Sequence, residues 1–227
     1  FKGWGPIKDE HLAAAIDEAH KLGHKFTADL GESIRRHRHA IDSGIDHLEH
    51  VIASTDGEGK PVSKEQVGQM IQYYIDHDVA LTSTLSVLDN KIKPKEVLEL
   101  LTDYSRKEYE RSPFGIFGEY VSDGKALKRQ QELQLEFWRK GGTLTVGTDP
   151  AVLGLIAGSG SLRAIELLVE SGISPLEVIK IATLNGAEAI GIADDRGTIE
   201  IGKRADLIVV NGDPSTDIKD IYKIETV

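Results

Sequence analysis

A buried apolar stretch ends in Gly-Thr-Asp-Pro at residues 143–150 (TLTVGTDP), and Asp149 is the first candidate for chemistry. In α/β barrels and open sheets, ligands and catalytic groups lie at the carboxyl ends of parallel strands. The pattern therefore predicts that Asp149 lies in a ligand-binding or catalytic site. The alternative interpretation is that Asp149 only caps a turn, because Asp before Pro favours turns.

A second strand with a polar end is predicted at IDHLEH, residues 45–50. Side chains alternate along a strand, so His47 and Glu49 share one face while Leu48 and His50 share the other. His50 at the strand end is a natural zinc ligand, because neutral imidazole coordinates divalent metals well. The alternative is a surface or packed histidine.

Helical and extended segments alternate with short connections, which predicts an α/β fold with parallel strands joined by right-handed crossovers. A Ser63–Gln66 capping box predicts the start of one helix. Helices are expected at 9–22, 33–43, 63–76, 94–140 (with a break between Pro113 and Gly118) and 174–190, and extended segments at 24–30, 45–52, 79–88 and 143–147. Residues 196–213 (RGTIEIGKRADLIVVNGD) predict two short strands around a glycine-containing turn, so we place a domain boundary near Asp194.

A formal net charge of -10 argues against a nucleic-acid partner or an anionic membrane surface. The basic run at 35–39 (RRHRH) is interpreted as a solvated helix face. The chain has no cysteine, so a metal would be held by His, Asp, Glu or a modified Lys. No membrane span or signal peptide is predicted, and the sequence indicates no compartment.

Four motifs occur in an order that resembles the C-terminal half of the amidohydrolase superfamily. They are HLEHV, GGTLTVGTDP, ELLVESGISPLEVIKIATLNGAEAIGI and RGTIEIGKRADLIVVNGDP. The similarity points to the imidazolonepropionase-like branch, which includes Xaa-Pro dipeptidases. The resemblance implies a TIM-type (β/α)8 barrel, present from about the fourth strand onward in residues 1–193. It also implies part of a small β-sandwich in residues 194–227.

The resemblance also implies a site with one or two divalent metal ions, zinc first. By position, His50 matches the sixth-strand histidine ligand and Asp149 the eighth-strand aspartate, while Lys2 matches the carbamylated lysine of the fourth strand. Asp29 stands where the family has a fifth-strand histidine. A harder, anionic ligand would shift preference towards manganese or magnesium, unless Asp29 marks a lost ligand.

One family feature is missing from the chain. Its only His-x-His, His37-Arg38-His39, falls in a predicted helix after the fourth strand. The 227 residues also fall short of the roughly 250 of a complete barrel. We therefore expect the first three strands to come from a complementing N-terminal segment, or the chain to form a homo-oligomer.

The expected activity is metal-dependent hydrolysis of a small amide, such as a dipeptide, an N-acyl amino acid or a cyclic amide. Asp149 would take a proton from the attacking water and pass it to the leaving nitrogen. Two other interpretations remain open. The chain could be a degenerate relative with an incomplete metal site and a binding role, or a small-molecule-binding α/β domain without hydrolytic activity.

Overall fold

The computed structural model describes residues 1–4, 7–89, 103, 107, 124–149 and 158–227. The chain divides into two compact units. The first contains Phe1–Ser83, Leu133–Thr145 and Lys180–Ala205, and the second contains Thr84–Glu132, Val146–Ile179 and Asp206–Val227. The helix break predicted between Pro113 and Gly118 lies outside the described residues. None of the helices in the described part is both long and apolar enough to span a membrane.

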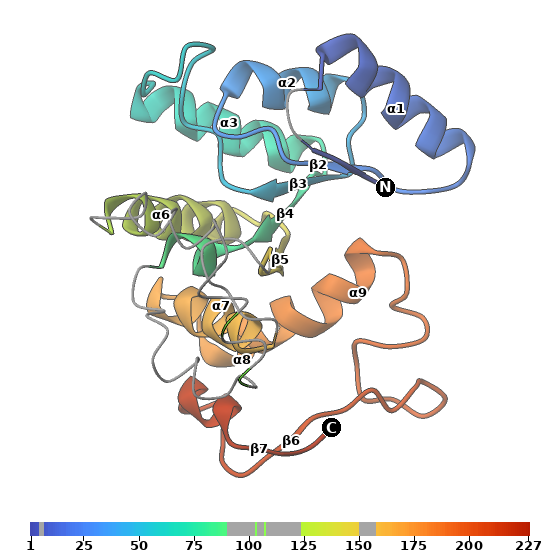
Figure 1. Ribbon diagram of the computed structural model, residues 1–227, viewed down its shortest axis with the longest axis vertical. Helices are drawn as coiled ribbons and strands as arrows, with labels where there is room; N and C mark the ends of the chain where they lie inside the picture. Colours follow the sequence, from blue (N-terminus) through green and yellow to red (C-terminus); the bar gives the residue numbers. More distant parts are fainter. Residues whose placement is uncertain (5–6, 90–102, 104–106, 108–123, 150–157) are drawn as a thin grey trace. The chain divides into compact units, whose positions relative to one another are not determined.

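A five-stranded sheet, counted over the described residues, organises the first unit (Figure 1). Its strands lie side by side in chain order, and the first four pair in parallel. They are β1 (Lys2–Gly3), β2 (Thr27–Ala28), β3 (His47–His50), β4 (Ala80–Ser83) and β5 (Leu144–Val146). The prediction of an α/β fold with a parallel sheet is confirmed.

Three helices make the crossovers between the first four strands. They are α1 (Asp9–Lys21), α2 (Ile34–Asp42) and α3 (Lys64–Asp76), and Figure 1 shows them together on one side of β1 to β3. The predicted capping box is present, because the Ser63 hydroxyl accepts from the Gln66 N–H while the Gln66 side chain accepts from the Ser63 N–H. A fourth helix, α6 (Lys125–Arg139), leads into β5.

The two faces of this sheet differ in character. Leu48 and Leu81 lie opposite each other on one face and are almost fully buried, as is Leu144 of β5. His47, Glu49 and Thr82 belong to the other face and are polar. β3 therefore alternates between its two faces, and burying each leucine stabilises the fold by about 1.5–3 kcal/mol.

Two predictions of extended structure are wrong. Residues 85–88 form a 3-10 turn, η1 (Leu85–Leu88), rather than continuing β4. The predicted hairpin within 196–213 is absent from the structure, because β6 (Val209–Val210) pairs instead with β7 (Ile224–Thr226). Ile199 and Ile201 lie outside any strand and are exposed. Short apolar runs specify a strand only when a neighbour is available to pair with them.

The helix predicted at 174–190 is interrupted. It consists of α8 (Pro175–Lys180), a π-helical turn at Ile181–Asn185 and α9 (Gly186–Ala189). In the first unit, the Asn185 side chain on this turn donates a hydrogen bond to the Leu144 carbonyl of β5 (3.0 Å). The π turn therefore ties this segment to the last strand of the sheet.

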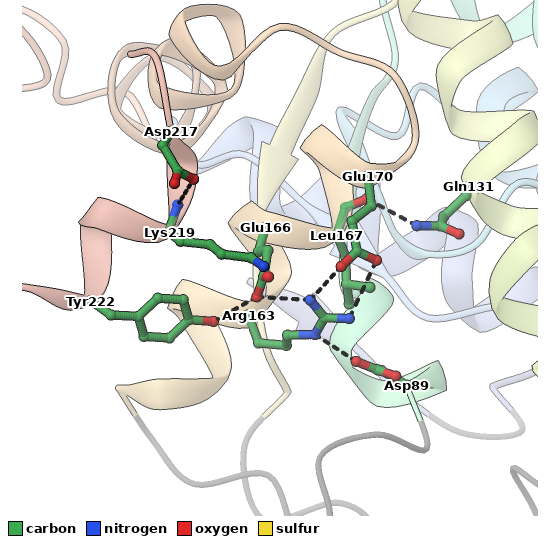
Figure 2. A network of polar contacts seen from close by, with 9 residues as sticks. All are labelled: Asp89, Gln131, Arg163, Glu166, Leu167, Glu170, Asp217, Lys219 and Tyr222. Atoms are coloured by element: carbon green, nitrogen blue, oxygen red, sulfur yellow. Dashed lines mark hydrogen bonds and ion pairs between the residues drawn. The ribbon is translucent and has the colours of Figure 1, made fainter. Parts of the chain in front are cut away.

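An arginine surrounded by carboxylates forms the polar core of the second unit (Figure 2). Arg163 lies on α7 (Ser159–Glu170) and pairs with Asp89 (2.6 Å), Glu166 (2.7 Å) and Glu170 (2.8 Å). Tyr222, on the 3-10 turn η4 (Ile218–Tyr222), donates its hydroxyl to Glu166 (3.0 Å). The Asp89 side chain is 0% exposed, so its charge depends on partners within the protein.

The interpretation of residues 35–39 as a solvated helix face is wrong for His37. Arg35 and Arg38 are exposed, but the His37 side chain is fully buried. His37 shares a helix face with the buried residues Ala40 and Ile41, three and four positions further on, and this face turns inward. Burial lowers the pKa of His37 from 6.5 to about 4, and the hydrogen bond to Gly31 and the charge of Asp29 oppose this only in part.

We expect the free energy of unfolding to fall as the pH drops below about 6.5, because the unfolded chain then binds a proton at His37 that the folded chain does not bind. The loss from this group amounts to about 2 kcal/mol at pH 5 and stops growing near pH 4. Urea unfolding at pH 7 and pH 5 measures it. The variant His37→Gln should show a smaller difference between the two pH values, and an equal difference would contradict the assignment.

Replacing Arg163 by Met should lower the free energy of unfolding by about 3–5 kcal/mol, because it leaves the buried Asp89 carboxylate without its guanidinium. Lys60→Met is the matched control, since the Lys60–Glu58 side chains are 73% and 74% exposed. That variant should lose less than about 1 kcal/mol. Equal losses in urea unfolding would show that the Arg163 cluster is not a buried network.

Candidate metal centre

Two predicted metal ligands meet at the carboxyl edge of the sheet. Asp29 directly follows β2, and His50 is the last residue of the neighbouring parallel strand β3. The His50 Nε2 atom lies 3.5 Å from the Asp29 Oδ2 atom, and the two side chains are 15% and 27% exposed. The other carboxylate oxygen, Oδ1, accepts the Gly31 N–H (3.1 Å), which fixes the orientation of the carboxylate.

The separation of this pair fits two ligands of one ion. A charge-assisted hydrogen bond between the two groups would bring them to about 2.7–2.9 Å. Two donors that each lie about 2.1 Å from a tetrahedral zinc ion stand about 3.4 Å apart, close to the observed 3.5 Å. An imidazole nitrogen and a carboxylate oxygen are also suitable donors for a divalent metal. Within the part of the chain that the structure describes, however, no three His, Cys, Asp or Glu side chains gather at one point.

The backbone at His50 adopts a conformation that few residues other than glycine adopt. Its φ is 72°, and among the described residues only Asp78 and Asp149 are other non-glycine residues with positive φ. Asp78 follows the end of α3, where a left-handed residue commonly ends a helix. His50 and Asp149 have no such helix end before them. Strained backbone of this kind clusters at functional sites.

This left-handed residue ends the regular alternation of β3. The alternation alone would place His50 on the face of Leu48, whereas the structure places its imidazole next to Asp29. The His50 carbonyl accepts a hydrogen bond from the buried side chain of Gln134 (3.1 Å), and this bond helps to hold the backbone. The role of Gln134 is not predictable from the sequence, because a glutamine inside a helix carries no local signal of a partner 84 residues away.

The other two predicted site residues lie outside this pair. Lys2 is on β1, opposite Thr27 of β2, and its side chain is exposed. No hydrogen bond or ion pair of the Lys2 ammonium is found among the described residues. Asp149 belongs to the second unit, three residues after the end of β5, and is partly exposed. The structure thus brings His50 and Asp29 together, while the roles of Lys2 and Asp149 stay predictions.

Polar side chains on the face of His47 and Glu49 form three further contacts. His47 Nε2 lies 2.8 Å from the Thr82 hydroxyl and 3.4 Å from that of Thr145. The Thr27 hydroxyl donates to Glu49 (2.9 Å). Burial lowers the pKa of His47 below its usual value, so this imidazole is neutral at pH 7. His47 and Glu49 were predicted to share a face, whereas the threonines that bind them were not predicted.

The chain is similar to a known protein family and to several of its members. The model of the Amidohydrolase family matches residues 4–227. S-triazine hydrolase of Gordonia rubripertincta is 25% identical over 233 aligned residues, which cover 88% of this chain and 46% of the hydrolase. Imidazolonepropionase of Thermoplasma volcanium is 37% identical over 57 residues, which cover 25% of this chain and 14% of that enzyme.

The fold is also similar to that of a solved structure. The crystal structure of a Xaa-Pro dipeptidase with bound methionine in the active site superposes with a TM-score of 0.67 at 22% identity. The match covers 98% of this chain and 48% of the dipeptidase. The chain therefore spans less than half the length of these relatives. Because the family model covers nearly every residue, this chain belongs to the amidohydrolase family.

Proposed function

We propose that this chain is part of a metal-dependent hydrolase that cleaves a carbon–nitrogen bond of a small amide. The observation that carries the proposal is the 3.5 Å approach of His50 to Asp29 at the carboxyl edge of a parallel sheet. Catalytic groups of α/β proteins lie at that edge. The family supports hydrolytic chemistry, and the described pair supplies donors suited to a divalent ion.

In the proposed architecture, the parallel sheet forms part of a (β/α)8 barrel, and the C-terminal strands β6 and β7 form part of a small β-sandwich. A further segment of polypeptide or a second copy of the chain would complete the barrel. His50 and Asp29 would hold the ion together with Asp149 and, as a carbamate, Lys2. Zinc is the first candidate, and the carboxylate of Asp29 also allows manganese or magnesium.

Asp149 and the His50–Asp29 pair have different roles in the proposed reaction. A divalent ion held by these residues would supply Lewis acidity, which lowers the pKa of water and polarises a carbonyl. Asp149 accepts the proton of the attacking water and then donates it to the leaving nitrogen. His50 and Asp29 would hold the ion in place, because Gln134 restrains the His50 backbone and the Gly31 N–H orients the Asp29 carboxylate. We propose a dipeptide, an N-acyl amino acid or a cyclic amide as substrate.

The names of the relatives are consistent with this class of bond. They include an S-triazine hydrolase, an imidazolonepropionase and a Xaa-Pro dipeptidase. These names indicate chemically different substrates. The relatives therefore support the proposal of a carbon–nitrogen bond, but they favour no particular substrate.

A second candidate function is a binding role without turnover. It is favoured by one observation: only two metal donors, His50 and Asp29, are paired at the sheet edge, and no group of three occurs among the described residues. Metal analysis of the purified protein separates the two candidates. About one equivalent of bound metal or more supports the hydrolase, whereas less than about a tenth of an equivalent supports the binding role.

We expect His50→Ala and Asp29→Ala each to weaken zinc binding by more than about 100-fold, because changing residues behind a ligand already costs 10- to 100-fold. Titration against a chelating zinc indicator measures the dissociation constant. His77→Ala is the control, since His77 is an exposed histidine at the end of α3. Equal zinc affinity in all four proteins would contradict the proposed centre.

We expect Asp149→Asn to lower kcat by about 10²- to 10⁴-fold, the usual contribution of an acid–base group. Folding should persist, because Asn tolerates the left-handed conformation that Asp149 adopts (φ 48°). Initial rates are measured with N-acyl amino acids, Xaa-Pro dipeptides and cyclic amides, and circular dichroism checks the fold. Turnover retained at the wild-type rate would exclude Asp149 as the acid–base group.

A further inference from the structure

A buried histidine and a buried tyrosine contact each other between α2 and α3. The His37 Nδ1 atom lies 2.8 Å from the Tyr74 hydroxyl, and both side chains are almost completely inaccessible to solvent. Neither residue is part of the proposed metal centre or of the proposed reaction. Buried polar groups without partners are costly, so the other atoms to which this pair bonds are informative.

The pair continues at both ends into the backbone. The Ala53 N–H donates to the Tyr74 hydroxyl oxygen (3.1 Å), and the His37 Nε2 atom lies 2.8 Å from the Gly31 carbonyl. A carbonyl can only accept, so Nε2 carries the proton in neutral His37. Nδ1 must then accept from the tyrosine, whose oxygen accepts from Ala53. One arrangement of hydrogens satisfies all three contacts.

The two ends of this hydrogen-bond chain lie in the loops that carry the candidate ligands. Gly31 is two residues after Asp29, and Ala53 is three residues after His50. The same loops also bond directly, because the Ser54 and Thr55 N–H groups both donate to the Glu32 carbonyl (2.9 Å each). The β2–α2 and β3–α3 loops are therefore joined directly through the Glu32 carbonyl and again through the His37–Tyr74 pair.

We propose that His37 and Tyr74 act as a positioning strut that sets the distance between Asp29 and His50. The strut consists of neutral hydrogen bonds in a buried, close-packed site, where small displacements of either loop are resisted. Removing the tyrosine hydroxyl would leave the buried Ala53 N–H without an acceptor and His37 Nδ1 without a donor. The His50 loop would then lose its core attachment to the Asp29 loop.

Tyr74→Phe tests the strut, and Tyr73→Phe is its matched control. Tyr73 is the preceding residue of the same helix, and its hydroxyl donates to Asp42 on α2, not to either loop. Hydrogen exchange of backbone amides is followed by NMR in the full chain. We expect the Ala53 amide to exchange at least about tenfold faster in Tyr74→Phe than in Tyr73→Phe. The Leu81 amide, which bonds to Thr143 within the sheet, should change far less.

The consequence for the metal centre rests on the proposed function and is measured separately. We expect Tyr74→Phe to weaken zinc binding by about tenfold and Tyr73→Phe to leave it unchanged. If the pair only adds to overall stability, Tyr74→Phe accelerates amide exchange equally at Ala53 and Leu81, and that result overturns the proposal. When Asp29→Ala and His50→Ala do weaken zinc binding, faster exchange at Ala53 with unchanged zinc affinity in Tyr74→Phe also overturns it.

A failure of the proposed function would be distinguishable. If Asp29→Ala and His50→Ala bind zinc as the wild type does, the metal centre is wrong, while the exchange rates at Ala53 still decide whether the strut joins the loops. Should Tyr74→Phe not fold, His37→Leu replaces it, because leucine removes the imidazole that joins the Tyr74 hydroxyl to the Gly31 carbonyl. The Ala53 N–H keeps its acceptor in this variant, so the readout is zinc affinity, which should fall about tenfold relative to Tyr73→Phe.

Discussion

Parallel pairing of β2 with β3 is the constraint on which the candidate centre depends. The register sets Ala28 opposite Leu48, so Asp29 leaves β2 beside the last two residues of β3, Glu49 and His50. β2 contains only two residues, and its few hydrogen bonds would align the loops poorly by themselves. An isolated parallel bridge between Ser33 and Thr55 pairs the two segments again beyond the strands. The His50–Asp29 approach depends on these pairings.

The two histidines of β3 show how one short strand serves different purposes. His47 follows the alternation and is held by Thr82 and Thr145 on the polar face. His50 departs from it through a left-handed backbone and meets Asp29 instead. The conformational cost of about 1–3 kcal/mol at such a residue must be offset by surrounding contacts, among them the Gln134 hydrogen bond. Strained residues that are held by their surroundings in this way are typical of functional sites.

Local signals were sufficient to predict most of the regular structure. The capping box at Ser63 and the alternation of side chains in residues 47–50 each act within a few residues. The meeting of Asp29 and His50 was not predicted from spacing, although resemblance to the family assigned both to one site. The burial of His37 was missed because its partner Tyr74 lies 37 residues away. The partner of residues 209–210 was predicted wrongly for the same reason, because β7 lies beyond the predicted hairpin.

The carboxylate cluster around Arg163 also constrains the order in which the second unit can assemble. Its members are separated in sequence by 74 residues, between Asp89 and Arg163, and by 56 residues, between Glu166 and Tyr222. Closing loops of this length costs entropy before any contact offsets it. Because Asp89 precedes Arg163 by 74 residues, it emerges first during synthesis and lacks this guanidinium until α7 follows. We therefore expect the turn that carries Tyr222 to dock late in the folding of this unit.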